Sequence, residues 1–268
     1  MAEPGPGTRP AAMTRDDGPL RLTVLGSAAA WSMTTGNPSS AYLVELGGAA
    51  LLLDIGQGSF AALAARRDPA SLAGIVVSHL HPDHCVDLVP LRHYLKYGRV
   101  PPGSVPLFAP APIRERFDAF VGEAGFLEAL PGDPLVPGTL DVGPFRVEAV
   151  RVTHTDSSFA VRVSRHGPHG PGLVYSGDCG RADDLRAVIR PGDTLLVEAS
   201  WGAEPVDPAA HHLDAAAAAG VARDGSAGRL VLTHLMAHVT AARALRVARR
   251  TFAGPVLLAR PGLVVDVA

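Results

Sequence analysis

Cysteine, long apolar runs and excess charge are all scarce in this chain. Only two of its 268 residues are cysteines, Cys85 and Cys179, so no disulfide framework is expected and a reducing cytoplasm is the expected location. No run approaches the length of about 18 apolar residues that a membrane span requires, so no membrane partner is expected. The formal net charge of −2 gives no electrostatic basis for bulk nucleic-acid binding.

The first 18 residues also contain few apolar side chains. They read MAEPGPGTRPAAMTRDDG and are rich in proline, glycine and charge. They lack the apolar core of a signal peptide, and we expect residues 1–18 to be disordered. No sharp change of composition follows, so residues 19–268 are expected to form a single folded domain.

Short apolar segments of strand length recur along the rest of the chain. The first ones form an antiparallel block with a hairpin turn at Gly47-Gly48, and later strands alternate with helices. This order predicts an α/β fold in one domain. Strands are predicted at residues 20–26, 41–46, 49–54, 74–77, 105–109, 145–153, 158–164, 173–176, 193–198 and 229–233 and near Val256 and Val264. Helices are predicted at residues 59–67, 86–97, 113–126, 214–223 and 240–251.

The most distinctive stretch is Ser78-His79-Leu80-His81-Pro82-Asp83-His84, directly after the apolar run at residues 74–77. Such a run is typical of a buried strand that presents ligands at its carboxyl end. Alternate residues of an extended segment point the same way, so His79 and His81 can share one metal ion. The proline then turns the chain, and Asp83 and His84 can serve a second ion. A polar loop with incidental histidines is the alternative, but four nitrogen and oxygen donors at this spacing favour a metal site.

Three further donors end apolar segments later in the chain. His154 follows Arg151-Val152-Thr153, Asp178 follows Tyr175-Ser176-Gly177, and His234 follows a run of five residues that ends in Thr233. Folds that alternate strands and helices build their sites at the carboxyl ends of strands. Each donor alone is more often structural, but together with the histidine stretch they indicate one site.

The histidine stretch resembles the HxHxDH signature of the metallo-β-lactamase superfamily at every ligand position. The resemblance implies a four-layer αββα sandwich and a hydrolase with two metal ions that share a bridging hydroxide. It implies that Asp178 bridges the ions and that Asp83 also orients the nucleophile. Donors without thiolate suit two Zn²⁺, although Mn²⁺ or Fe would be accommodated. The implied ligands are His79, His81 and His154 for one ion and Asp83, His84 and His234 for the other.

Asp54 follows the third expected strand and allows two interpretations. It can steady the histidine stretch from behind the ligands, or it can cap the turn before Gly56. The sequence leaves both open.

A second resemblance indicates the type of reaction more closely. Glu198-Ala199-Ser200 and His211-His212, just before an alanine-rich helix, lie between Asp178 and His234, as similar segments do in the ribonuclease Z group. The resemblance implies that His212, held by Glu198, protonates the departing ribose oxygen. His211 is an adjacent alternative, and a solvated histidine at a helix start is another.

The chain departs from ribonuclease Z in one respect. That group holds tRNA with a long insertion between its third and fourth metal motifs, whereas about two dozen residues separate His154 from Asp178 here. The compact chain resembles the small bacterial cyclic-nucleotide phosphodiesterases related to ribonuclease Z. We therefore expect a small phosphodiester substrate and no stable nucleic-acid binding, and a homodimer is possible. The alternatives are a ribonuclease Z-like tRNA 3′ endonuclease and a lactone or thioester hydrolase, in which Glu198 and His212 would matter little.

Overall fold

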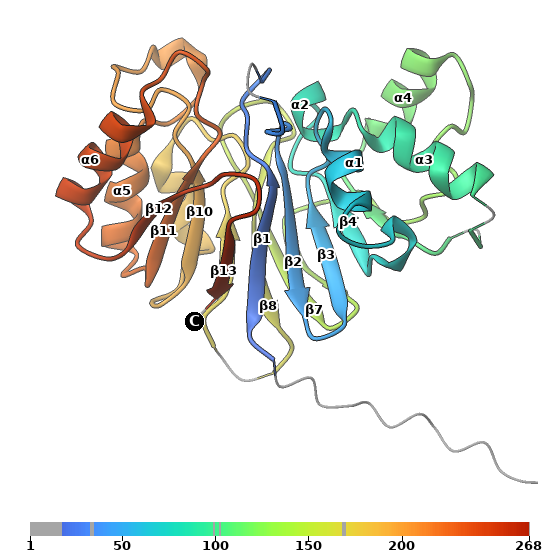
Figure 1. Cartoon of the computed structure of the whole chain (residues 1–268), viewed down its shortest axis with the longest axis horizontal. Helices are drawn as coiled ribbons and strands as arrows, with labels where there is room; N and C mark the ends of the chain where they lie inside the picture. The colour runs from blue at the N-terminus through green and yellow to red at the C-terminus, as the bar shows by residue number, and fades with distance from the viewer. Residues whose placement is uncertain (1–17, 33–34, 99, 102, 168–169, 268) are drawn as a thin grey trace, which may run out of the picture.

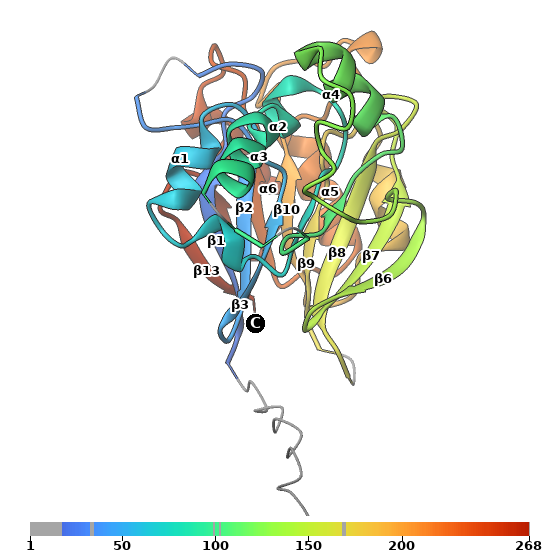
Figure 2. The same ribbon diagram turned by 90° about the vertical axis from the view of Figure 1, so that its right-hand side faces the viewer.

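Two β-sheets pack face to face and carry helices on their outer surfaces (Figures 1 and 2). The computed structural model describes residues 18–32, 35–98, 100–101, 103–167 and 170–267. The disorder expected for residues 1–18 therefore falls, apart from Gly18, outside the described residues. Among the described residues, no helix is both long enough and apolar enough to span a bilayer.

The first sheet has the strand order β13-β1-β2-β3-β4-β5. Its amino-terminal strands are antiparallel, and Leu46 pairs with Ala49 across the expected turn at Gly47-Gly48. β3, β4 and β5 are parallel neighbours, so the chain must cross over between them. The bounds are β1 (Leu20–Gly26), β2 (Ala41–Leu46), β3 (Ala49–Leu53), β4 (Gly74–Val76), β5 (Leu107–Phe108) and β13 (Val264–Val267).

The second sheet has the order β12-β11-β10-β9-β8-β7-β6. β6 to β9 pair in antiparallel fashion, and β9 to β12 are parallel. β1 to β5 and β6 to β12 thus each begin with antiparallel pairs and end with parallel ones. The antiparallel opening block and the later alternation of strands with helices were predicted from the sequence. The bounds are β6 (Gly138–Val142), β7 (Phe145–Arg151), β8 (Phe159–Arg165), β9 (Leu173–Tyr175), β10 (Thr194–Glu198), β11 (Arg229–Thr233) and β12 (Val256–Leu258).

The helices cover the outer face of each sheet. One apolar cluster joins the first sheet to its helices, and another joins the second sheet to α5 and α6. Together with the two sheets they make the four-layer αββα arrangement that was predicted. The helices are α1 (Ser59–Ala64), α2 (Pro82–Cys85), α3 (Leu88–Tyr97), α4 (Ile113–Val121), α5 (Ala215–Asp224) and α6 (Ala241–Thr251), with 3₁₀ turns η1 (Pro69–Ser71), η2 (Ala182–Ala187) and η3 (Pro208–Ala210).

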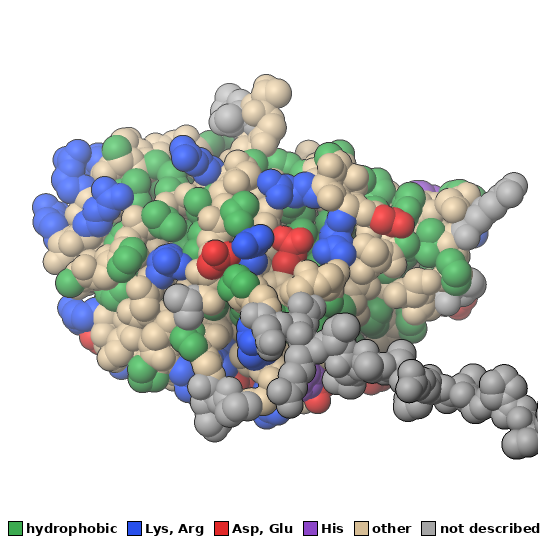
Figure 3. Space-filling model, turned by 60° about the horizontal axis from the view of Figure 1, so that its bottom comes forward, with side chains coloured by type: hydrophobic (Ala, Val, Ile, Leu, Met, Phe, Trp, Pro, Cys, Tyr) green, Lys and Arg blue, Asp and Glu red, His purple; other side chains and the backbone are tan. Residues whose placement is uncertain are grey.

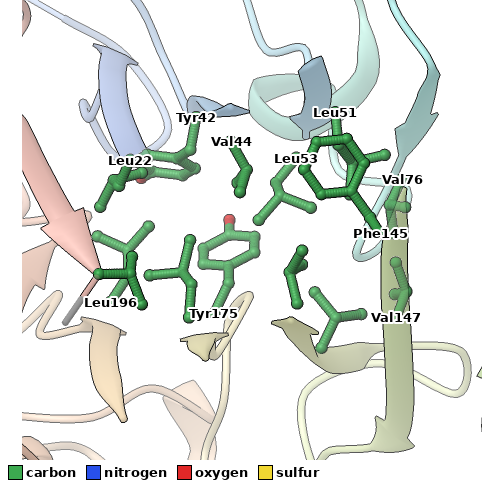
Figure 4. Packing of buried hydrophobic residues seen from close by; sticks show 14 of the residues in the cluster. Leu22, Tyr42, Val44, Leu51, Leu53, Val76, Phe145, Val147, Tyr175 and Leu196 are labelled. Carbon is green, nitrogen blue, oxygen red and sulfur yellow. The ribbon is translucent and has the colours of Figure 1, made fainter. Parts of the chain in front are cut away.

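The main core lies between the two sheets (Figure 4). Burying each of these large side chains stabilises the fold by about 1.5–3 kcal/mol. This packing holds the carboxyl ends of β4, β9, β10 and β11 in one region of the molecule. The first sheet contributes Leu22, Tyr42, Val44, Leu51, Leu53 and Val76, and the second contributes Phe145, Val147, Tyr175 and Leu196.

Two local predictions differ from the structure. β6 was not predicted, because this edge strand is mostly exposed and its residues lack a clear apolar alternation. α4 was expected to extend to residue 126 but ends at Val121, because Gly122 adopts a left-handed conformation with φ 74°. Glycine at this position is the usual way to stop a helix.

Candidate metal centre

The histidine stretch leaves the carboxyl end of β4 and enters α2, a helix of only four residues. His81 is the last extended residue, with ψ 145°, and Pro82 opens the helix, the position where proline is best tolerated. The change from extended to helical backbone places Asp83 and His84 in a second group of donors, although the ring centroids of His79 and His84 are only 4.1 Å apart. One short segment thereby provides donors on two sides.

The first group of donors consists of His79, His81, His154 and Asp178. His81 Nδ1 lies 3.0 Å from His79 Nε2 and 3.1 Å from His154 Nε2. Asp178 Oδ2 lies 3.6 Å from the Nε2 atoms of both His79 and His154. Donor atoms around a tetrahedral zinc are separated by roughly 3.3 Å, so these spacings fit one ion.

The second group consists of Asp83, His84 and His234. The Nε2 atoms of His84 and His234 are 3.2 Å apart, and His234 Nε2 is also 3.2 Å from Asp83 Oδ2. Asp178 Oδ1 lies 3.3 Å from His84 Nε2. The spacing again fits one ion.

Asp178 lies between the groups, with one carboxylate oxygen facing each of them. Its Oδ1 atom is buried and accepts no hydrogen bond from the described residues. A buried carboxylate oxygen without a donor is costly unless a cation satisfies it. The structure thus has the donor set and the unsatisfied oxygen that two neighbouring metal ions would require.

Hydrogen bonds behind the ligands set the protonation of the imidazoles. His84 Nδ1–H donates to Asp54 Oδ2 over 2.7 Å. Ser78 Oγ–H donates to the same carboxylate, so Ser78 accepts from His79 Nδ1–H at 3.1 Å. In the neutral form of both rings Nε2, the atom that faces the group, therefore carries the lone pair that a metal bond needs. Asp54 contacts the ligands and does not cap the turn at Gly56.

Two of the other three imidazoles are held in the same way. Ser200 Oγ–H donates to Glu198 Oε2 over 2.6 Å, which leaves its oxygen to accept from His234 Nδ1–H at 2.9 Å. His154 Nδ1–H donates to the carbonyl oxygen of His211 over 2.9 Å. These bonds again direct Nε2 of each ring into the centre.

The charges in the centre favour a bound cation. Burial would raise the pKa of Asp178, but the surrounding imidazoles outweigh it and hold that pKa well below its usual range. Burial and the neighbouring imidazoles hold the pKa of His79 well below its usual range, despite the charge of Asp178. A carboxylate and a neutral imidazole are the forms that bind metal. Burial opposes a charge on His84, but Asp178 and Asp54 outweigh it and raise its pKa well above the ordinary value.

Glu198 and His212 form a separate pair at the edge of the centre. His212 Nδ1–H donates to Glu198 Oε1 over 2.8 Å, and Glu198 also accepts from the Cys179 N–H. The Nδ1 atom of His212 is 3.9 Å from Asp178 Oδ2, so it belongs to the glutamate. Burial disfavours the charged ring, but Glu198 outweighs this and raises the pKa of His212.

His211 and His212 are adjacent but have different contacts. His211 adopts a left-handed conformation with φ 49°, and its carbonyl oxygen faces His154. Its own ring nitrogen Nδ1 lies 3.3 Å from the His154 carbonyl oxygen. The ring of His212 instead lies against the rings of His154 and His234, at 4.7 and 5.9 Å between centroids.

Several residues of the site were not recognised from the sequence. Ser78, Ser200 and Tyr175 supply hydroxyl groups to Asp54 or Glu198, and the Ala30 N–H donates to Asp83 Oδ2 over 2.7 Å. Ser200 lies inside the Glu-Ala-Ser segment, which was the one available signal. The Ala30 contact spans 53 positions and left no local pattern.

Neither cysteine contributes a donor. Both Cys85 and Cys179 are buried. Burial raises the pKa of each thiol to about 12, so neither is a thiolate at neutral pH. Both fill space beside the ligands, as small buried cysteines usually do.

Comparison with known proteins agrees with this geometry. The profile of the β-lactamase superfamily domain matches residues 51–235, which include all seven donors. The chain belongs to the metallo-β-lactamase superfamily. It is a metal-dependent hydrolase with histidine and aspartate clusters suited to metal binding.

Relatives occur in several bacteria. An uncharacterized protein of Mycobacterium tuberculosis is 32% identical over 250 residues, 88% of each chain. A ribonuclease Z of Nocardia farcinica is 29% identical and covers 80% of this chain and 86% of its own. The crystal structure of YhfI, a probable metallo-hydrolase of Bacillus subtilis, superposes with a TM-score of 0.82 at 25% identity, covering 92% and 99% of the two chains.

Proposed function

We propose that the chain is a phosphodiesterase with two metal ions that hydrolyses a small nucleotide, most suitably a cyclic one. The ions are Zn²⁺, with Mn²⁺ or Fe accommodated by the same donors. Bound there, they would supply a water that ionises near neutral pH and positive charge to oppose the developing negative charge. The proposed ligands are His79, His81 and His154 for one ion, Asp83, His84 and His234 for the other, and Asp178 for both.

The pair formed by Glu198 and His212 is the observation that carries this proposal. Its hydrogen bond fixes Nδ1–H of His212 on the carboxylate, so Nε2–H is the proton that the charged ring can release. A ribose alkoxide is a poor leaving group and requires such a proton. Hydrolysis of a lactone or thioester has less need of it. Asp83, held by Ala30, is proposed to orient the attacking water from the other side.

The route of the chain between His154 and Asp178 supports a small substrate. It contains β8 and β9, which pair in antiparallel fashion and are only seven residues apart in the sequence. No space remains in this length for a long tRNA-binding arm. The relationship to the ribonuclease Z of Nocardia farcinica nevertheless makes tRNA 3′-end cleavage the second candidate.

The distribution of surface charges is also consistent with a small substrate and not with tRNA. Figure 3 shows Lys and Arg side chains along the left edge of the molecule, the side where Figure 1 draws α5 and α6. The exposed arginines of α6 are Arg243, Arg246, Arg249 and Arg250. They lie on the outer layer of the second sheet, whereas phosphate contacts for a tRNA held over the metal centre would be needed around that centre.

We also propose that residues 19–268 act as one domain in the cytoplasm. Both sheets share one apolar core, so neither is expected to fold alone. Two free, buried cysteines suit a reducing compartment.

A substrate panel tests the function. Metal-loaded protein is assayed with a cyclic nucleotide, bis(p-nitrophenyl) phosphate, a precursor tRNA, a lactone and a thioester. We expect turnover of both small diesters and no specific cleavage of the precursor tRNA. Correctly placed tRNA cleavage at a higher rate than the small diesters would establish the second candidate. Turnover of only the lactone or the thioester would overturn both.

A further inference from the structure

A cavity of about 290 Å³ adjoins the second group of donors. His234 forms part of its wall, together with Thr233 and Leu235. Trp31 and Asn37 line it from the loop that follows β1. Its size is close to the lower end of the range of roughly 300–1,000 Å³ that small-molecule sites occupy. A ligand part placed there would be directly beside the metal centre.

Trp31 is 48% exposed, which is unusual for the largest apolar side chain. Phe120, another large exposed aromatic side chain that lines a cavity among the described residues, belongs to α4, and its cavity also borders α2. That second cavity measures about 140 Å³ and is apolar except for Arg116. Of these two aromatic groups, only Trp31 shares a cavity with one of the seven donors.

The loop that carries Trp31 is attached to both sides of the second group. Ala28 forms a bridge with Leu235, the residue after His234. Ala30 donates its N–H to Asp83 and adopts a left-handed conformation with φ 51°, which costs energy for a residue with a Cβ. The position of the indole is therefore coupled to the position of the ligands.

Asn37 adds a polar edge to the same cavity. Its Oδ1 atom accepts from the backbone N–H of Ser27 at 3.2 Å. The same N–H donates over a shorter distance, 2.9 Å, to the Pro38 carbonyl oxygen, and Ser27 Oγ lies 3.3 Å from Asn37 Oδ1, so the amide oxygen of Asn37 faces Ser27. The NH₂ group is consequently the part of Asn37 that can meet a ligand acceptor.

We propose that this cavity is the nucleobase subsite of the enzyme, with Trp31 as the stacking surface and Asn37 as a donor to a ring acceptor of the base. A base attached to a ribose phosphate bound at the metal centre needs a flat apolar surface and a polar edge nearby. The cavity offers both. This proposal rests on the proposed function, because it assigns the substrate class as a nucleoside phosphodiester.

Tryptophan fluorescence tests the subsite without a catalytic readout. The chain has two tryptophans, so Trp201→Phe leaves Trp31 as the single reporter. Titration of the metal-loaded variant with adenosine 5′-monophosphate should quench the emission, whereas ribose 5-phosphate, which lacks the base, should not. Equal responses to the two ligands, or no response to adenosine 5′-monophosphate, would overturn the proposal.

Kinetics provide the second test. Stacking of one base is worth about 5- to 150-fold in affinity, so Trp31→Leu should raise KM for the cyclic nucleotide roughly 10- to 100-fold with little change in kcat. Trp31→Phe should retain most of the affinity that Trp31→Leu loses. Phe120→Leu is the matched control at the other cavity and should leave KM unchanged. A rise in KM for Phe120→Leu alone would place the base there and refute the subsite beside His234.

The two tests separate the subsite from the function. If no phosphodiester is hydrolysed but adenosine 5′-monophosphate still quenches Trp31, the phosphodiesterase assignment fails and the subsite stands. If the cyclic nucleotide is hydrolysed and Trp31→Leu leaves its KM unchanged, the subsite fails and the function stands.

Discussion

The two halves of the metal centre are held in different ways. In the second group, Asp54 holds His84, Ser200 holds His234, and a backbone N–H holds Asp83. In the first group, Ser78 holds His79, but His81 is exposed and His154 depends on the carbonyl oxygen of His211. Buried carboxylates and hydroxyls thus hold both imidazoles of the second group but only one of the three imidazoles of the first. The second half is expected to be more rigid, and the first to adapt when a substrate binds.

Asp178→Ala removes the one residue that both halves share, and we expect the largest effect from it. Loss of the bridging carboxylate should reduce the metal content from two ions per chain to fewer than one. Phosphodiesterase activity should fall by about 10³-fold or more, because several kcal/mol of charge stabilisation disappear. Elemental analysis and kinetics measure the two quantities, and circular dichroism checks the fold. A variant that keeps two ions would show that the halves bind metal independently.

His212→Ala perturbs a residue that contacts both halves without binding either proposed ion. A cyclic nucleotide, whose ribose alkoxide needs a proton, should be hydrolysed roughly 10²–10⁴-fold more slowly. Bis(p-nitrophenyl) phosphate releases a stable phenolate and should be affected far less. His211→Ala is the neighbouring control.

The pattern of losses decides the role of His212. Metal content should be unchanged in both variants. Equal losses of activity on both substrates would indicate that His212 positions the substrate. A larger loss for His211→Ala would identify His211 as the proton donor.

Asp54→Asn weakens the direct support of His84 in the second group and, through Ser78, the indirect support of His79 in the first. Groups that hold metal-binding histidines typically contribute 10–100-fold to metal affinity. We therefore expect a loss of roughly this size for the ion at the second group and a smaller loss for the ion at the first. Competition with a chelator at two strengths measures both affinities. Asp193→Asn is a matched control, because Asp193 is equally buried but lies at the opposite end of β10, where it accepts from Arg162. An equal loss of both ions in Asp54→Asn would show that Asp54 supports the two halves equally and would contradict this prediction.

The sequence predicted most of the fold because local signals were strong. The segments at β1, β2 and β11 have buried, apolar patterns and were placed within a residue. β6 was not predicted, since an exposed edge strand does not need a periodic pattern of apolar residues. The end of α4 was not predicted either, because the backbone conformation of Gly122 decides it. The αββα layering came from family resemblance, and pattern alone reached only an α/β class.

The candidate site likewise has features that the sequence predicted and features that only the structure revealed. Alternation in an extended chain and the ends of apolar segments indicated one site, and the family resemblance assigned the seven donors to it. The structure brings these donor atoms together in neighbouring groups. Spacing cannot tell which oxygen of Asp178 faces which group, or that the left-handed turn at His211 directs the ring of His212 toward Glu198. These features depend on contacts between segments far apart in the chain. Ala30 and Trp31 are the clearest case. They become part of the site only because the folded chain brings the loop after β1 against Asp83 and His234.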